Sequence, residues 1–161
     1  MSPFVEKIFE TLTIEITFNR KRIILSNFYH PPNNSLESID SFLNEFESLL
    51  NLFSRNDTLY LMFTDSNVNL LKINHCLSSQ RFLETIHSNG FLNGINRATR
   101  IHNTSYSLID QILFKNEPSN YECGIILSDL SDHFFFSFHQ NKPKNTQKLI
   151  KLRDFSQKKL K

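Results

Sequence analysis

Residues 59–67 of the 161-residue chain read Leu-Tyr-Leu-Met-Phe-Thr-Asp-Ser-Asn. Its first part, Leu59 to Phe63, is a short all-apolar run, which is typical of a strand buried on both faces of a sheet. Asp65 and Asn67 follow immediately, so polar side chains stand where this strand ends. The stretch therefore predicts a central strand that carries a polar site at its end.

A hairpin is predicted before this strand. Between Leu12 and Phe18, apolar and polar residues alternate with a period of two, which indicates a half-buried strand. Asn19-Arg20-Lys21 is a polar turn, and a second strand runs from Arg22 to Tyr29. Pro31-Pro32 ends that strand and begins a loop.

Two helices and three further strands complete the predicted elements. Apolar residues recur at helical spacing over residues 36–53, and a second helix over 79–88 is closed by Asn89-Gly90 as a left-handed cap. Short strands are predicted over residues 107–114, 122–127 and 134–139, and the tail from residue 146 is predicted to be helical. Hairpin and crossover connections together favour an α/β sandwich with mixed sheets.

Composition excludes several classes of protein. With 39% hydrophobic and 21% charged residues, the chain is predicted to be a soluble globular domain, without a membrane span or a secretory signal. Two cysteines, Cys76 and Cys123, cannot form a disulfide scaffold, and we expect both to be free thiols. Only three glycines are present, so no phosphate-binding loop of the dinucleotide or P-loop kind can be written. We expect an intracellular protein, with the nucleus among the compartments allowed.

The net charge of +2 hides an asymmetry along the chain. Residues 142–161 contain eight basic residues and one acid, so residues 1–141 contain ten basic and fifteen acidic residues. We therefore predict a domain over residues 1–141 and a basic helical connector over 142–161. The connector is interpreted either as a contact with nucleic acid or as a solvated linker.

Polar residues at strand ends form a candidate site. Asp110 lies inside an apolar strand, and a buried carboxylate is costly unless it is paired, so we expect it to bond to His133. Asp65 and Asp132 are hard oxygen ligands suited to Mg²⁺, whereas Asn67 and Tyr29 could hydrogen-bond a phosphate without adding negative charge. The set suits metal-assisted phosphodiester hydrolysis. Taken singly, each residue could equally belong to a turn, a cap or the packing around it.

Motifs in this order resemble a known family. The chain carries Tyr29-His30-Pro31-Pro32, Thr64-Asp65-Ser66-Asn67, Ala98-Thr99-Arg100-Ile101, Leu108-Ile109-Asp110-Gln111-Ile112 and Ser131-Asp132-His133. These resemble the Tyr-Arg-Pro-Pro, Gly-Asp-Phe-Asn, Pro-Thr-Arg-Ile, Leu-Ile-Asp-His-Ile and Ser-Asp-His motifs of the endonuclease domain of LINE-type (non-LTR) retrotransposons, in the endonuclease/exonuclease/phosphatase superfamily. The resemblance implies a DNase I-like α/β/β/α sandwich that nicks DNA with Mg²⁺ or Mn²⁺, in a parent element that also carries a reverse transcriptase.

The resemblance also implies roles for single residues. Asp65 would orient or deprotonate the attacking water, Asn67 would hold the scissile phosphate, and Tyr29 would lie near the phosphate or the leaving oxygen. His133, oriented by Asp110, would contact the phosphate in the transition state. Asp132 would be a metal ligand. Arg100 and Thr99 would contact nucleic acid.

Departures from the family pattern bear on activity. Family members place a metal-binding Glu on a strand upstream of the hairpin, and Glu10, nineteen residues before Tyr29, is too near to be that residue. Thr64 and Ser66 stand where the family has Gly and Phe, and Thr64 is expected to be strained if close backbone approach is needed there. We expect an N-terminally truncated domain with weak metal binding and impaired activity, an unpaired sheet edge and exposed apolar surface. An inactive remnant with residual nucleic-acid binding is the alternative, and a small-molecule phosphatase is a third, weaker one.

Overall fold

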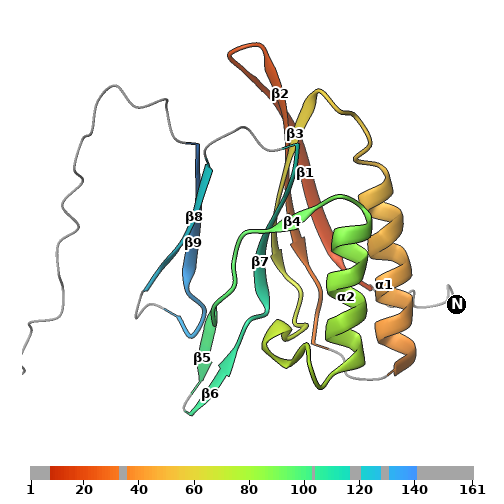
Figure 1. Ribbon diagram of the computed structural model, residues 1–161, viewed down its shortest axis with the longest axis vertical. Coiled ribbons are helices and arrows are strands. Elements are labelled where there is room, and N and C mark those ends of the chain that lie inside the picture. The colour runs from red at the N-terminus through yellow and green to blue at the C-terminus, as the bar shows by residue number, and fades with distance from the viewer. Residues whose placement is uncertain (1–7, 33–35, 103, 117–120, 128–130, 141–161) are drawn as a thin grey trace, which may run out of the picture.

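The computed structural model describes residues 8–32, 36–102, 104–116, 121–127 and 131–140. Its main element is a five-stranded mixed sheet, in the order β1-β2-β3-β7-β4 (Figure 1). β2 and β3 run parallel, and the other neighbours are antiparallel. The strands are β1 (Glu10–Phe18), β2 (Lys21–Tyr29), β3 (Thr58–Asp65), β7 (Asp110–Lys115) and β4 (Leu92–Asn93). The predicted N-terminal hairpin and central strand are confirmed.

The turn between β1 and β2 has a tight two-residue form. Asn19 and Arg20 both have positive φ, 50° and 63°, and Phe18 pairs with Lys21 across the turn. Two consecutive residues with positive φ are typical of a type I′ turn, whose twist matches that of the flanking strands. The turn therefore fixes the register of the hairpin over all nine residue pairs.

The two predicted helices cover one face of the sheet (Figure 1). They are α1 (Leu36–Asn51) and α2 (Leu77–Ser88), and α2 is followed by Asn89 and Gly90, whose φ of 74° is the predicted left-handed cap. Aromatic rings fill the space between the layers: Phe28 of β2 lies 5.1 Å from Phe46, which lies 5.3 Å from Phe82 between ring centroids. Each of these rings is at most 1% exposed. This helix–sheet interface is the hydrophobic core.

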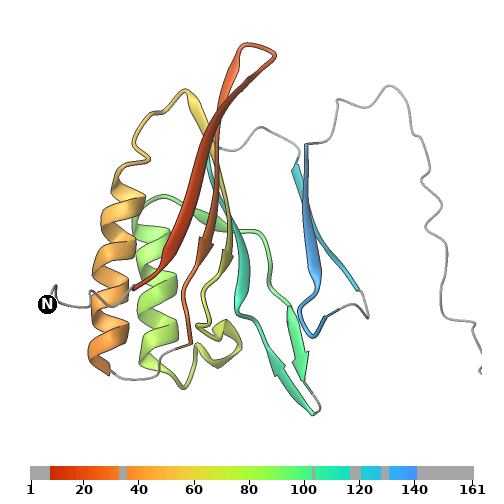
Figure 2. The same ribbon diagram turned by 180° about the vertical axis from the view of Figure 1, so that it is seen from behind.

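A two-stranded ribbon lies on the opposite side of the sheet from the helices (Figures 1 and 2). It consists of β8 (Tyr121–Ile126) and β9 (Phe135–Gln140). Its rings pack on β7, where Phe114 lies 4.4 Å from Tyr121 and 5.6 Å from Phe138 between centroids. The described residues thus form three layers, α/β/β, in the order expected of the predicted sandwich.

One predicted strand is wrong in its extent. Residues 107–114 were expected to form a single strand, but the chain forms the hairpin of β5 (Arg100–His102) with β6 (Ser105–Ser107), and β7 starts only at Asp110. Leu108 and Ile109 separate the two pieces, and Leu108 N–H bonds to Asn69 Oδ1 at 3.0 Å instead of to a strand. A side-chain acceptor from a distant loop therefore interrupts the predicted strand. A short helix, η1 (Leu70–Lys72), follows the loop after β3.

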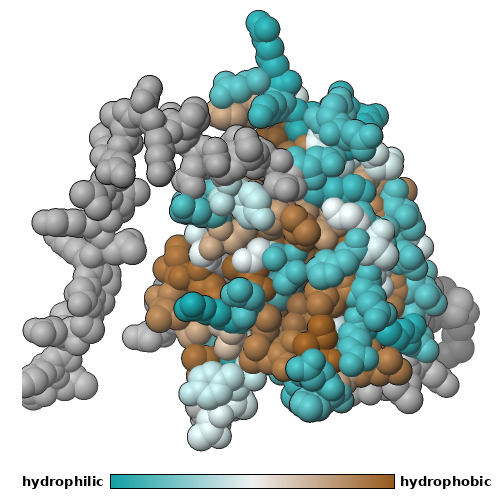
Figure 3. All heavy atoms as spheres, viewed as in Figure 1, coloured by the Kyte–Doolittle hydropathy of each residue, from teal (hydrophilic) through white to brown (hydrophobic). Residues whose placement is uncertain are grey.

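Among the described residues, the face of the sheet opposite the helices is covered near β7, by the ribbon. All nine residues of β1 are exposed, so the prediction of a half-buried strand is wrong: no described layer packs on the apolar side of this edge strand, where Leu12 is 70% and Phe18 65% exposed. Apolar side chains also gather on the side of the ribbon (Figure 3), where Ile126 is 55% exposed. Within the described residues β1 pairs with β2 alone, so the expected free edge and exposed apolar surface are confirmed.

Among the described residues no helix is long and apolar enough to cross a membrane. The predicted connector over residues 142–161 lies outside the described part of the chain. The division of the chain at residue 141 stays a prediction.

Candidate active site

Strand register places three of the predicted residues in one row. Tyr29, Asp65 and Asp110 are Cα partners across β2, β3 and β7. Directly opposite residues in a sheet project to the same face, and here that is the face opposite the helices. The row therefore gathers a phenol and two carboxylates at one end of the sheet. Glu10 is paired with Tyr29 at the far side of the row, two strands from Asp65.

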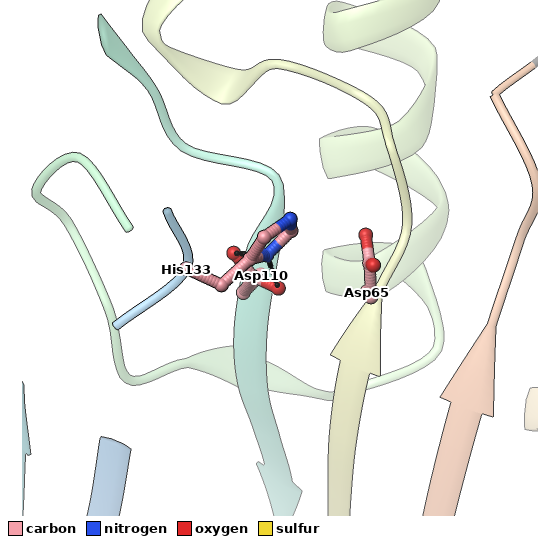
Figure 4. A group of neighbouring side chains, drawn as sticks. All are labelled: Asp65, Asp110 and His133. Carbon is pink, nitrogen blue, oxygen red and sulfur yellow. Dashed lines mark hydrogen bonds and ion pairs between the residues drawn. The ribbon is translucent and has the colours of Figure 1, made fainter. Parts of the chain in front are cut away.

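Asp110 and His133 form the predicted hydrogen-bonded pair (Figure 4). His133 Nδ1 lies 3.1 Å from Asp110 Oδ1 and 3.2 Å from Oδ2, and Asp110 is only 4% exposed. A carboxylate on Nδ1 fixes the proton there and leaves Nε2 for a ligand. This contact satisfies a carboxylate that the apolar strand would otherwise bury at high cost.

The segment that carries His133 is hydrogen-bonded to β5 and to Thr99, the residue before it. Phe134 N–H donates to the Thr99 carbonyl at 2.8 Å, and Ile101 N–H donates to the Asp132 carbonyl at 3.0 Å. Arg100 and His133 form an isolated antiparallel bridge. Backbone bonds on both sides of His133 thus hold its ring beside Asp110.

Thr99 supports Asp110 from within the protein. It is 0% exposed, and its Oγ1 accepts hydrogen bonds from the backbone N–H groups of Ile109, at 3.3 Å, and Asp110, at 3.2 Å. The Thr99 side chain thus positions the backbone of Asp110. The nucleic-acid contact predicted for Thr99 stays a prediction.

Asp65 is the third member of the cluster. Its Oδ1 is buried and has no hydrogen-bond partner among the described residues. Burial raises the pKa of Asp65, and the charge of Asp110 raises it further, whereas His133, the backbone N–H of Asn67 and Arg100 act in the opposite direction. Ligand atoms of Asp65, Asp110 and His133 all lie within 4.8 Å of one another, so these residues could hold a cation.

Asn67 shapes the turn that follows Asp65. Its φ is 52°, a left-handed conformation that Asn tolerates better than most residues, and its Nδ2 donates to the His30 carbonyl at 2.8 Å. The side-chain amide is therefore held against the backbone, with Oδ1 as its remaining polar atom. Its predicted role as a phosphate ligand stays a prediction.

The departures at positions 64 and 66 fit the fold without strain. Thr64 is an ordinary residue of β3, paired with Phe28 and Gln111, and has no positive φ, so the expected strain is absent. Ser66 is 0% exposed, and its hydroxyl donates to the Ile109 carbonyl at 2.8 Å. The hydroxyl thus joins the loop after β3 to the start of β7, where Asp110 stands.

Asp132 lies apart from the three clustered residues. Its carboxylate accepts from Arg100 Nε at 2.7 Å, and both side chains are more than a third exposed. The hydrogen bond from Arg100 holds the pKa of Asp132 below its ordinary range. Arg100, predicted to contact nucleic acid, is thus engaged with the predicted metal ligand, and both roles stay predictions.

His30 is a structural residue that the sequence reasoning missed. It is 2% exposed, stacks on Phe42 with 3.9 Å between ring centroids, and its Nδ1 donates to the Ser66 carbonyl at 2.9 Å. Burial lowers the pKa of His30. Its backbone N–H also bonds to the Asp65 carbonyl at 2.9 Å, so it supports the turn carrying Asp65 and Asn67. The sequence offered one signal for this role: His30 stands in Tyr29-His30-Pro31-Pro32 where the motif it resembles has Arg.

Comparison with known proteins supports the fold. No family model matches the chain, and no curated protein sequence matches it. Among solved structures, the endonuclease domain of TRAS1, a telomere-specific non-LTR retrotransposon, aligns with TM-score 0.61 and 15% identity, over 83% of this chain and 64% of that one. A beta toxin variant of Staphylococcus aureus with bound magnesium ions aligns with TM-score 0.60 and 13% identity, over 81% and 57%. D. rerio TDP2 in complex with a single-strand DNA product aligns with TM-score 0.54 and 13% identity, over 86% and 64%.

These alignments define the fold class. The chain has the α/β architecture of the endonuclease/exonuclease/phosphatase proteins, as the resemblance of its motifs implied. It spans 64% of the TRAS1 domain and 57% of the beta toxin. At 15% identity or below, the likeness concerns the fold, and the chemistry has to be argued from the site.

Proposed function

We propose that this chain is a metal-dependent phosphodiesterase domain that nicks DNA, of the kind found in non-LTR retrotransposons. The single observation that carries the proposal is the cluster of Asp65, Asp110 and His133, with ligand atoms within 4.8 Å of one another. It stands at one end of the sheet of a fold that nucleases and phosphodiesterases share. The ordered motifs around the cluster support the assignment to the retrotransposon type, with a reverse transcriptase as the partner domain.

Each clustered residue has a distinct task in this proposal. Asp65, whose pKa is raised by burial, accepts the proton of the attacking water. His133 hydrogen-bonds the phosphate through Nε2, while Asp110 accepts from Nδ1 and fixes the orientation of the ring. Asn67 and Tyr29, the latter 42% exposed at the end of β2, bind phosphate oxygens. Arg100 contacts the DNA backbone.

The residues present fit a hard divalent cation. The buried, unpaired Oδ1 of Asp65 is an oxygen donor of the type that Mg²⁺ and Mn²⁺ take. Asp110 offers a further carboxylate nearby, and Asp132 is the ligand that the resemblance adds. Such a cation supplies charge neutralisation for the phosphate. The choice between Mg²⁺ and Mn²⁺ belongs to the proposal.

Two observations favour a second candidate, an inactive domain with residual nucleic-acid binding. Arg100 occupies the carboxylate of Asp132 at 2.7 Å, and a carboxylate held in an ion pair is a weaker metal ligand. The inner face of the sheet is open along β1, where Leu12 is 70% exposed. The ion pair is expected to weaken metal binding, and the open face is expected to weaken the packing around the site. We therefore expect low activity even under the first candidate.

Nicking of supercoiled plasmid DNA by the purified chain with Mg²⁺ tests the proposal. We expect slow nicking that disappears in His133→Ala and in Asp65→Asn and persists in Glu47→Gln, a carboxylate change on an exposed position of α1. Nicking that survives in both site variants would contradict the assignment. Absence of nicking by a folded protein would favour the second candidate.

Metal binding has a separate readout. Titration of the ¹⁵N-labelled chain with Mn²⁺ is expected to broaden the amide signals of Asp65, Asp110 and His133 first. In Asp65→Asn this broadening is expected to need a higher Mn²⁺ concentration, by about 10-fold or more, because one ligand is lost. Broadening confined to other regions of the protein would exclude the proposed cation site.

A further inference from the structure

A buried polar pair lies directly behind the two carboxylates of the site. Thr64 and Gln111 are Cα partners in the β3–β7 ladder, one residue before Asp65 and one residue after Asp110. Because successive side chains point to opposite faces of a sheet, this pair projects toward the helices while Asp65 and Asp110 project away from them. Thr64 is 1% exposed and Gln111 is 0% exposed.

The polar atoms of this pair have no partner in the described part of the chain. Thr64 Oγ1, Gln111 Nε2 and Gln111 Oε1 are all buried, and none makes a hydrogen bond there. A side-chain amide can donate two bonds and accept two, and burying it unpaired is costly. Almost all such groups in folded proteins bond either to protein or to ordered water.

The neighbouring side chains on this face of the sheet offer these polar atoms no hydrogen-bond partner. Phe28 is the partner of Thr64 on β2, and Met62 and Leu113 are the next residues on the same face. All three are apolar and at most 1% exposed. The two polar side chains thus lie in an apolar layer, at directly opposed positions of the β3–β7 ladder.

We propose that Thr64 and Gln111 bind one internal water molecule that bridges β3 and β7. The water accepts from Gln111 Nε2 and exchanges hydrogen bonds with Gln111 Oε1 and Thr64 Oγ1, which gives it three partners, the usual number for a buried water. It ties the two strands together one residue behind Asp65 and Asp110, and so supports their spacing on the other face. This site does not depend on the proposed function.

Both residues depart from the motifs that they resemble. Thr64 and Gln111 stand at positions where these motifs have Gly and His, and the two positions are partners in the ladder. A glycine at position 64 would provide no hydroxyl for the bridge.

A crystal structure of the full chain at a resolution that reveals ordered water tests the site directly. We expect electron density for one water within hydrogen-bond distance of the Gln111 amide and Thr64 Oγ1. A direct hydrogen bond from the Gln111 amide to Thr64 Oγ1 with no water between them would overturn the proposal. So would a dry arrangement in which both side chains remain unpaired.

Stability measurements give an independent test with a defined sign. Gln111→Met keeps the length of the side chain and removes its polar atoms, so it lowers the urea midpoint if a bridge is lost and raises it if the amide was only an unpaired buried group. We expect a lower midpoint, and Gln80→Met, on a half-buried position of α2, is the matched control with an unchanged midpoint.

A double-mutant cycle decides whether the two residues share the ligand. The loss for Gln111→Met with Thr64→Val is expected to be smaller than the sum of the two single losses, because either change alone already breaks the bridge. Additive losses, or a raised midpoint for Gln111→Met, would contradict the proposal. If Gln111→Met fails to fold, Thr64→Val against the hydroxyl-retaining Thr64→Ser carries the comparison, with only the valine variant expected to lose stability.

Discussion

The carboxylates of Asp65 and Asp110 face each other across the β3–β7 ladder, as directly opposed residues on the same side of the sheet. His133 bonds to one of them, at 3.1 Å, and the buried Oδ1 of the other is unpaired among the described residues. The two acids therefore have different environments, which is how a site separates a positioning carboxylate from a proton-accepting one. The energetic cost falls on Asp65, because its buried Oδ1 has no hydrogen-bond partner among the described residues.

Asp65→Asn is expected to stabilise the protein at neutral pH while removing any nicking activity, by about 100-fold or more. The pKa of Asp65 is raised in the folded state, so its favourable contribution is present at low pH and is lost as pH rises through that raised pKa. Urea midpoints of both proteins at pH 4 and pH 7 measure this. The variant should gain over the native chain only at pH 7, and a loss at pH 7 would contradict the environment described for Asp65.

Thr99→Val is expected to loosen Asp110 without touching a ligand directly. It deprives the backbone N–H groups of Ile109 and Asp110 of their buried acceptor, at a cost of about 1–3 kcal/mol of unfolding free energy. Thr99→Ser keeps the hydroxyl and is the control. Urea unfolding gives the cost, and the NMR signals of the His133 ring should move in the valine variant alone. Equal behaviour of the two variants would refute the support role.

Acid is expected to destabilise the fold through His30. Burial lowers its pKa, so the folded state favours the neutral ring, and stability is present above the ordinary histidine pKa of 6.5 and is lost as pH falls below it. His30→Gln should reduce the slope of stability against pH between pH 6.5 and the lowered value. Identical slopes in the native chain and in His30→Gln would count against this account.

Gly94→Ala is expected to destabilise the protein by about 1–3 kcal/mol through overpacking. A Cβ at position 94 would meet Cys123 Sγ at 2.4 Å and Phe114 Cε1 at 3.3 Å, where the ribbon packs on β7. Gly124→Ala is the matched control, because its Cβ would meet only Ser137 Oγ, at an ordinary 3.5 Å. Thermal unfolding of both variants checks this, and equal midpoints would mean that the ribbon does not pack as described.

The two cysteines are expected to differ in reactivity. The Ser78 hydroxyl, 3.0 Å from Cys76 Sγ, is the main cause that lowers the pKa of Cys76 to about 7, whereas burial raises the pKa of Cys123. Alkylation by iodoacetamide, followed by mass spectrometry, should show Cys76 reacting first, with a rate that rises through pH 7. Ser78→Ala should move that midpoint upward. Faster labelling of Cys123 would contradict both environments.

Much of the architecture followed from periodicity in the sequence. Alternation over residues 12–18, the all-apolar run 59–63 and helical spacing over residues 36–53 predicted elements that the structure contains, because each periodicity matches the repeat of one kind of element. The predicted half-burial of the first strand was wrong, since all of β1 is exposed. The cost of burying a carboxylate predicted that Asp110 needs a partner, and His133 provides it. These are properties of single segments or of elementary charge energetics.

Other features depended on contacts between residues far apart along the chain. Residues 107–114 were predicted as one strand, yet bonds to Asn69 and Thr99 end one strand and delay the next. The pairing of Asp132 with Arg100 and the burial of His30 against Phe42 were equally invisible to local patterns. A hydroxyl, a guanidinium or a ring can serve many partners, and only the packed fold selects which one lies within reach.

The sequence by itself thus determined the kinds of element, their order and the acids that would need partners. Tertiary contacts selected which polar groups lie side by side, because the β3–β7 register alone pairs Asp65 with Asp110 and Thr64 with Gln111. A shift of one residue in that register would exchange the two faces and separate the carboxylates from His133. The candidate site is therefore a property of strand pairing, which no single segment of the chain contains.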